Sequence, residues 1–128
     1  MPEASASLHE PEDRLSPEVI DRHRAIVSLI EELEAADWYD QRAAAAGDAE
    51  LRDIITHNRD EEKEHAMMLL EWLRRNDPGF AEQIDVYIKA EGPVVKAEEA
   101  ASGDEGGASG GSSGGSLGIG SLRGHAVS

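Results

Sequence analysis

One stretch of the chain decides its fold: residues 57–77, which read HNRDEEKEHAMMLLEWLRRND. It reads as one continuous helix, because its apolar side chains recur every three or four residues. Within this stretch, Glu62 and His65 are three residues apart, so on a helix their side chains project from one face about one turn apart. The stretch therefore predicts a helix that presents a carboxylate and an imidazole side by side.

This pair lies on an apolar strip that extends in both directions along the predicted helix. The strip consists of Leu51, Ile55, Asn58, Glu62, His65, Leu69 and Trp72. An unpaired carboxylate on a buried face loses much of its solvation, so Glu62 requires a metal ion, another cation or a proton there. This placement favours metal ligands over surface decoration. The charged side chains expected to face solvent, with no role in a site, are Lys63, Glu64 and Glu71.

The signals at the helix ends predict an antiparallel hairpin. Ser16 can cap a first helix whose first residue is Pro17, and Gly47 stops that helix. Asp48 then caps the second helix, over residues 49–75. Because only two residues separate the helices, the middle of the first lies beside the middle of the second. The fold class is therefore all-α.

Composition sets the boundaries around this hairpin. Asp77 and Pro78 can open a short third helix that continues to Gly92 and Pro93, and residues 94–101 can add a turn or two. Eleven of the 13 glycines lie from Gly92 onward. We expect four segments: a flexible N-terminal arm (1–14), a helical hairpin domain (15–101), a Gly/Ser-rich linker (102–116) and a disordered C-terminal tail (117–128).

Charge and cysteine content limit the partners and the chemistry. The formal net charge is −15, from 27 acidic and 12 basic residues, which argues against nucleic acid or an anionic membrane as partner. There is no cysteine, so a metal site must use carboxylates and imidazoles, which suit iron, manganese or zinc. No apolar run is long enough to span a membrane, and the N-terminus does not resemble a signal peptide, so we expect a cytoplasmic protein.

The first helix offers acidic residues at the level of Glu62. Glu31 and Glu32 are about 100° apart on a helix, so periodicity alone does not choose the inward one, although Glu32 shares a face with Tyr39. Glu31 shares another face with Glu34 and Trp38. That second acidic face can hold or relay cations, or it can be an ordinary solvated patch.

One hairpin supplies half of the ligands of a ferritin-like di-iron centre. Such a centre uses two Glu-x-x-His pairs and a glutamate from each of two further helices. A two-fold dimer of hairpins would complete this set as a four-helix bundle, with Glu62 of each chain able to bridge two metal ions. Paired irons reduce oxygen, each giving one electron, and Tyr39 can tune a ligand or supply an electron. Aromatic packing at a helix interface is the better explanation of either Tyr39 or Trp38 taken alone.

The runs over residues 22–42 (RHRAIVSLIEELEAADWYDQR) and 57–77 closely resemble the encapsulated ferritins, the hairpin cargo of encapsulin nanocompartments. The resemblance implies a ferroxidase whose site lies across a subunit interface in a ring-shaped oligomer, a decamer. It implies two irons per interface, bound by Glu32, Glu62 and His65, with Tyr39 beside them. It also implies a secondary site at Glu31 and Glu34, near Trp38, for calcium or another divalent cation.

The end of the chain regains apolar character after the linker. Its segment from Leu117 to Arg123 resembles the targeting peptide of encapsulin cargo, so we expect Leu117, Ile119 and Leu122 to anchor the chain on the inner wall of an encapsulin shell. Many tails on one oligomer would add avidity. The expected location is thus the cytoplasm, inside the nanocompartment, with iron delivered into the shell for storage.

Two alternatives use the same residues differently. A rubrerythrin-like di-iron peroxidase would share the ligands and turn over faster with hydrogen peroxide than with oxygen. A non-enzymatic helical adaptor would use its acids for solubility alone and its tail for binding. It would form a metal-independent oligomer without bound iron.

Overall fold

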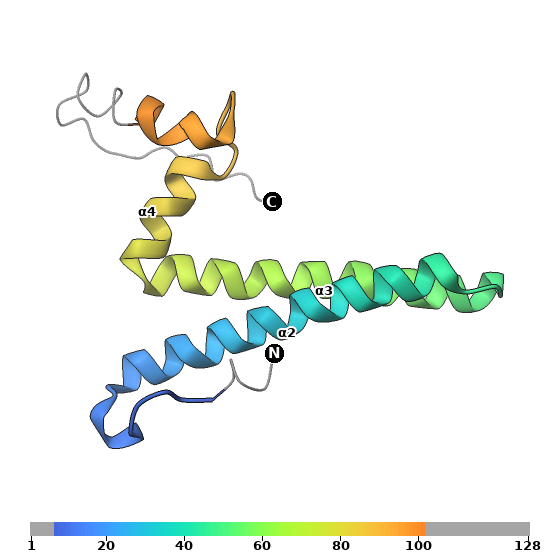
Figure 1. Cartoon of the computed structure of the whole chain (residues 1–128), viewed down its shortest axis with the longest axis horizontal. Helices are drawn as coiled ribbons and strands as arrows, with labels where there is room; N and C mark the ends of the chain where they lie inside the picture. The colour runs from blue at the N-terminus through green and yellow to red at the C-terminus, as the bar shows by residue number, and fades with distance from the viewer. Residues whose placement is uncertain (1–6, 102–128) are drawn as a thin grey trace. The chain divides into compact units, whose positions relative to one another are not determined.

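The computed structural model describes residues 7–101, and every regular element in this range is helical. The elements are η1 (Glu12–Arg14), α2 (Pro17–Ala45), α3 (Ala49–Asn76), α4 (Pro78–Tyr87) and η2 (Val94–Lys96) (Figure 1). The predicted all-α class is confirmed. The expected linker, 102–116, and tail, 117–128, lie outside the described residues.

The two long helices begin where the sequence predicts. The Ser16 side chain accepts a hydrogen bond from the Val19 amide at 3.2 Å, and Pro17 is the first residue of α2. The Asp48 side chain accepts a hydrogen bond from the Leu51 amide at 2.9 Å at the start of α3. Both caps satisfy amides that have no partner within the helix.

The helices α2 and α3 pack along each other as an antiparallel hairpin (Figure 1). Two ion pairs mark how the helices are aligned. Arg22 Nε lies 3.8 Å from Asp77 Oδ2 at one end, and Arg59 Nη1 lies 2.8 Å from Asp40 Oδ1 further along. Residue numbers therefore rise along α2 as they fall along the facing side of α3.

The buried strip between these helices is thin. It consists of Ala25 and Ala43 on α2, with Ala66 and Leu73 on α3. The predicted strip of α3 is wrong at its two ends, because Leu51 and Trp72 are 49% and 36% exposed, whereas Leu73 is completely buried. Alanines allow the helices to approach closely, which leaves no room between them for an indole.

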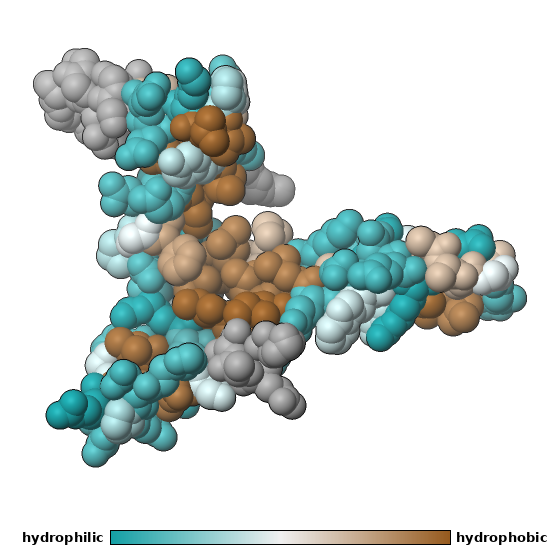
Figure 2. All heavy atoms as spheres, in the orientation of Figure 1, coloured by the Kyte–Doolittle hydropathy of each residue, from teal (hydrophilic) through white to brown (hydrophobic). Residues whose placement is uncertain are grey.

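The hairpin leaves large apolar side chains exposed on both of its sides. Val19, Ile26 and Leu33 are spaced by seven residues along α2 and are 36%, 37% and 52% exposed. On α3, Met67 follows the buried Ala66 whereas Trp72 precedes the buried Leu73, so the two lie on opposite sides of the buried strip. Figure 2 shows an apolar area, coloured brown, on one hairpin face near the C-terminal end of α3.

The third helix is shorter than predicted. α4 ends at Tyr87, not near Gly92, because Lys89 adopts a left-handed conformation with φ 64°, which is typical of the residue just past a helix end. Residues 97–101 are helical after η2, within the range where a turn or two was expected. Contacts divide the chain into two units after Ala81, and the first unit contains the whole hairpin.

Candidate metal centre

Three potential metal ligands meet in the middle of the hairpin. Glu32 comes from α2, and Glu62 and His65 come from α3; one ligand atom from each lies within 4.8 Å of the other two. His65 Nδ1 is 3.3 Å from Glu62 Oε1 and 3.5 Å from Glu32 Oε1. The helix spacing of three residues and the antiparallel alignment together produce this cluster.

The distances suit a single small cation. Bonds of about 2.0–2.2 Å between a transition metal and oxygen or nitrogen place neighbouring ligand atoms roughly 3 Å apart. The distances from His65 Nδ1 to the two carboxylates, 3.3 and 3.5 Å, are within about half an ångström of that spacing. Two carboxylates and one imidazole form a ligand set for iron, manganese or zinc.

The pKa values of Glu32 and His65 are both raised, as expected where negative charges are crowded together. A hydrogen bond with Glu62 raises the pKa of Glu32 above its ordinary 4.5, and burial and the Glu62 charge add to this rise, which His65 opposes. Burial lowers the pKa of His65, but hydrogen bonds and charges of Glu62 and Glu32 outweigh it and raise this pKa above 6.5. A cation bound between these side chains would offset the crowding of negative charge that raises the pKa of Glu32.

The cluster lies halfway along the hairpin, but at its edge and not between the two helices. The side chains of Glu32, Glu62 and His65 are 27%, 22% and 43% exposed. His65 directly precedes Ala66, the residue that packs against α2 and is only 1% exposed. The imidazole is consequently turned toward one open side, which leaves coordination positions free for further ligands.

The structure distinguishes the two acidic faces of α2. Glu32 joins Glu62 and His65, whereas Glu31 is exposed. Within residues 7–101, Glu31 and Glu34 do not belong to a cluster of three or more potential metal ligands.

The two aromatic residues of α2 lie on different surfaces. Tyr39 is half-buried, and the Arg42 guanidinium lies 5.6 Å from the centre of its ring. Trp38 is 48% exposed and borders a shallow hollow of about 330 Å³ with Gln41 and Arg42. Neither aromatic side chain is among the three converging ligands.

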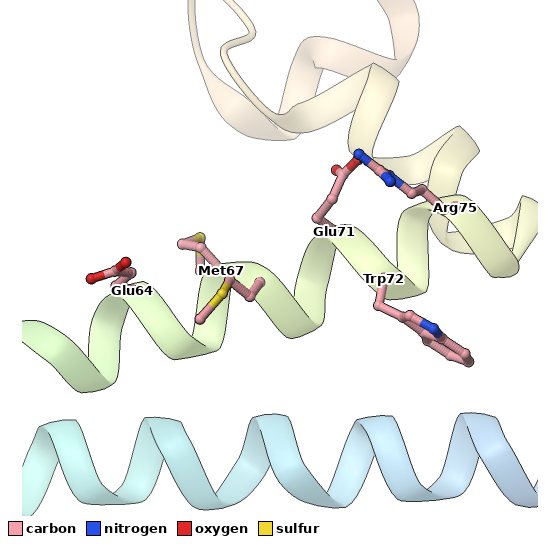
Figure 3. A pocket seen from close by; sticks show the side chains of 6 residues that line it. Glu64, Met67, Glu71, Trp72 and Arg75 are labelled. Atoms are coloured by element: carbon pink, nitrogen blue, oxygen red, sulfur yellow. The ribbon is translucent and has the colours of Figure 1, made fainter. Parts of the chain in front are cut away.

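A larger open groove, of about 640 Å³, lies on another surface of α3. Its lining residues are Glu64, Met67, Met68, Glu71, Trp72 and Arg75. Glu64 and Glu71 point away from α2 (Figure 3). Hydrogen bonds from Arg74 and Arg75 lower the pKa of Glu71 to about 2. Glu32, Glu62 and His65 are not among the residues that line this groove.

Arg59 lies near the cluster and is not among the site residues expected from the sequence. It lies three residues before Glu62, and its side chain is only 23% exposed. Its guanidinium contacts Asp40 on α2 and Asp60 on α3. The sequence does contain a signal for it: an arginine on the face of α3 that meets α2, one turn before Glu62.

An all-α hairpin that brings carboxylates and an imidazole together from facing helices has the fold and ligand types of the ferritin-like proteins. The chain matches the EncFtn-like family over residues 7–91 and belongs to this family. The resemblance to encapsulated ferritins is thereby confirmed. The family relates the chain to ferritin-like proteins, a class in which such side chains bind iron.

Individual relatives agree with this assignment. An "Encapsulated ferritin-like protein" of Rhodospirillum rubrum is 54% identical over 132 residues, which cover 98% of this chain and 94% of the relative. A "Ferritin-like protein" of Thermotoga maritima is 50% identical over 95 residues, 74% of this chain and 83% of the relative. The crystal structure of protein ne0167 from Nitrosomonas europaea matches with a TM-score of 0.66 and 55% identity, covering 69% of this chain and 97% of that one.

Among the helices of residues 7–101, none combines the length and the apolar character needed to cross a bilayer.

Proposed function

We propose that the protein is a ferroxidase that oxidises iron(II) to iron(III) with oxygen at a di-iron centre shared by two subunits. The observation that carries this proposal is the meeting of Glu32, Glu62 and His65 within 4.8 Å in one hairpin. Family membership adds support, because ferritin-like di-iron proteins use glutamate and histidine side chains of packed helices.

The second subunit completes the ligand set. One hairpin offers two carboxylates and one imidazole, half of the ligands of a four-helix di-iron centre. A two-fold axis beside the open side of His65 would double these ligands and let the two Glu62 carboxylates bridge two ions. Exposed apolar residues next to the cluster, such as Trp72, supply surface that such a dimer can bury.

The proposed reaction moves one electron from each of two iron(II) substrates. The two electrons and two protons convert one oxygen molecule into hydrogen peroxide, leaving two iron(III) ions. Glu32, Glu62 and His65 bind the irons, and the negative carboxylates favour the higher charge of iron(III). Tyr39, which shares a helix face with Glu32 two turns away, would tune a ligand or supply an electron.

Glu31 and Glu34, near Trp38, would form a secondary cation site in the assembly. Glu31 and Trp38 are seven residues apart on α2, so they share a face. In the described chain Glu31 is exposed and Glu34 is half-buried, and their cluster would need carboxylates from a further subunit. Calcium or another divalent cation would suit carboxylate oxygens alone.

Assembly would proceed beyond the dimer to a ring-shaped oligomer, a decamer. The hairpin has apolar residues on both sides of its buried strip, with Met67 on one side and Trp72 on the other. One side would complete the metal centre and the second would join neighbouring dimers, which is how rings of subunits form.

The C-terminal tail would attach this oligomer to the inside of an encapsulin shell in the cytoplasm. Leu117, Ile119 and Leu122 are the proposed anchors, and residues 102–116 the linker. The alignment with the R. rubrum encapsulated relative covers 98% of the chain and thus extends into this region. Iron(III) would leave the oligomer for storage in the shell.

The test combines assembly and turnover. Anaerobic iron(II) should increase the mass of the full-length chain in native mass spectrometry, and oxygen should then convert the bound iron to iron(III). Glu62→Ala and His65→Ala should abolish both effects, whereas the matched control Glu64→Ala, an exposed carboxylate of the same helix, should retain them.

Unchanged oxidation by the Glu62 and His65 variants would contradict the proposal. Faster iron oxidation with hydrogen peroxide than with oxygen would identify the rubrerythrin-like alternative. A metal-independent oligomer that binds no iron would identify the adaptor.

A further inference from the structure

Arg59 joins α2 to α3 close to the metal ligands. Its Nη1 atom donates to Asp40 Oδ1 on α2 at 2.8 Å, and its Nε atom donates to Asp60 Oδ1 on α3 at 3.0 Å. The Arg59 side chain is 23% exposed, although arginines are mostly exposed in proteins. Its stem therefore lies against the hairpin while the guanidinium is held from both helices.

The alignment of the two helices has few other determinants on this side of the cluster. The buried residues are alanines except for Leu73, and a methyl group fills little of the groove on a facing helix. Leu73 and the pair of Arg22 with Asp77 lie beyond the cluster toward the C-terminal end of α3. Toward its N-terminal end, Arg52 Nη2 donates to the Ala46 carbonyl oxygen at 2.7 Å beside the turn. The pair of Arg59 with Asp40 joins side chains of the two helices closer to the cluster.

We propose that Arg59 is a positioning residue for the metal centre. Its pair with Asp40 fixes the axial alignment of α2 on α3, and this alignment keeps Glu32 opposite His65. The inference rests on the proposed role of these three side chains as ligands. A slip of one residue moves Glu32 about 1.5 Å along the helix axis, more than the roughly 0.5 Å that a preorganised site tolerates.

The pair acts on alignment and contributes little to stability. The Asp40 side chain is 64% exposed, and ion pairs in contact with water add little to the free energy of unfolding. Polar groups held between packed helices can nevertheless select one helix register over another. A variant without the pair should therefore fold normally and bind metal poorly.

The test is a double-mutant cycle in the full-length chain, with cobalt(II) as a spectroscopic probe of the ligand geometry. Arg59→Gln and Asp40→Asn should each weaken cobalt(II) binding about tenfold, the lower end of the range for residues that orient ligands, and change its visible spectrum. Their melting temperatures should remain close to that of the unaltered protein. The double variant should lose no more than either single one, because both remove the same contact. Arg75→Gln, which removes an arginine paired only within α3 to Glu71, is the matched control.

Three outcomes would overturn the inference. These are a cobalt(II) spectrum and affinity unchanged in Arg59→Gln, losses that multiply in the double variant, or losses that follow a large fall in melting temperature. A failure of the ferroxidase proposal would give a different result. Arg59→Gln would still weaken cobalt(II) binding, but the unaltered protein would not oxidise iron(II).

Discussion

Glu32 on α2 and His65 on α3 face each other across the hairpin, with 3.5 Å between Oε1 and Nδ1. Glu32 reaches His65 only because the turn between the helices and their axial alignment bring these two residues to the same level. It also separates Glu32 from its neighbour Glu31, whose side chain is exposed. The cluster thus has one definite α2 carboxylate.

Replacing this carboxylate should remove the activity of the centre. Glu32→Gln keeps the size of the side chain and removes its charge, so iron(II) oxidation should fall about 100-fold, as expected for a lost ligand contact. Glu31→Gln should reduce it far less, because Glu31 is not in the cluster. Initial rates of iron(III) formation after anaerobic loading compare the two. Equal losses in both variants would contradict the assignment.

Cation binding should release protons and strengthen as pH rises. Hydrogen bonds and charges of Glu62 and Glu32 outweigh burial and raise the pKa of His65, so its imidazole keeps to higher pH a proton that a cation must displace. The stability that this proton confers is present below pH 6.5 and is lost as pH rises through the folded-state pKa. Calorimetric titration with cobalt(II) in buffers of different ionisation enthalpy measures the released protons. His65→Ala should release fewer, and a buffer-independent heat in the unaltered protein would count against this prediction.

Glu71 should contribute stability that depends on pH in the opposite sense. Hydrogen bonds from Arg74 and Arg75 lower its pKa from 4.5 to about 2. The stabilisation is therefore complete above pH 4.5 and is lost as pH falls toward 2. Because the side chain is 41% exposed, solvent screening limits it to about 1 kcal/mol at neutral pH. Urea unfolding of Glu71→Gln should show this difference at pH 7 and a smaller one near pH 3.

Removing the tail should separate encapsulation from catalysis. A chain ending at Ala101 keeps the hairpin and its three ligands, so it should oxidise iron(II) at the rate of the full-length protein. Co-expression with a shell protein should then yield empty shells. A full-length chain with Leu117, Ile119 and Leu122 replaced by serine is the control for length. Loss of oxidation in the shortened chain would show that the tail serves the centre directly.

Much of the hairpin follows from local sequence signals. The caps at Ser16 and Asp48 and the two-residue connection fix where the helices start and how they return. The spacing of Glu62 and His65 likewise sets their common face. Periodicity did not give the rotation of α3 at its C-terminal end. Trp72 and Leu73 are adjacent apolar residues, and the predicted strip included Trp72 although Leu73 is the one that is buried.

Other features depend on contacts between distant residues. The choice between Glu31 and Glu32 requires knowing which face of α2 meets α3. The early end of α4 depends on the left-handed backbone of Lys89. Lysine rarely adopts this conformation, so the residue type does not predict a helix end there. The pair of Arg59 with Asp40 likewise appears only when the helices are aligned.

The small size of Ala66 determines how closely the two helices that carry the ligands can approach each other. Its methyl group, 1% exposed, separates the backbones of two helices that each carry ligands, and it directly follows His65. The width of a coordination sphere formed by these ligands would therefore be set by the smallest chiral side chain. Related chains with a bulkier residue there would spread the same two carboxylates and imidazole and so prefer ions of larger radius. Evolution could thus change metal preference in this fold while leaving every coordinating residue untouched.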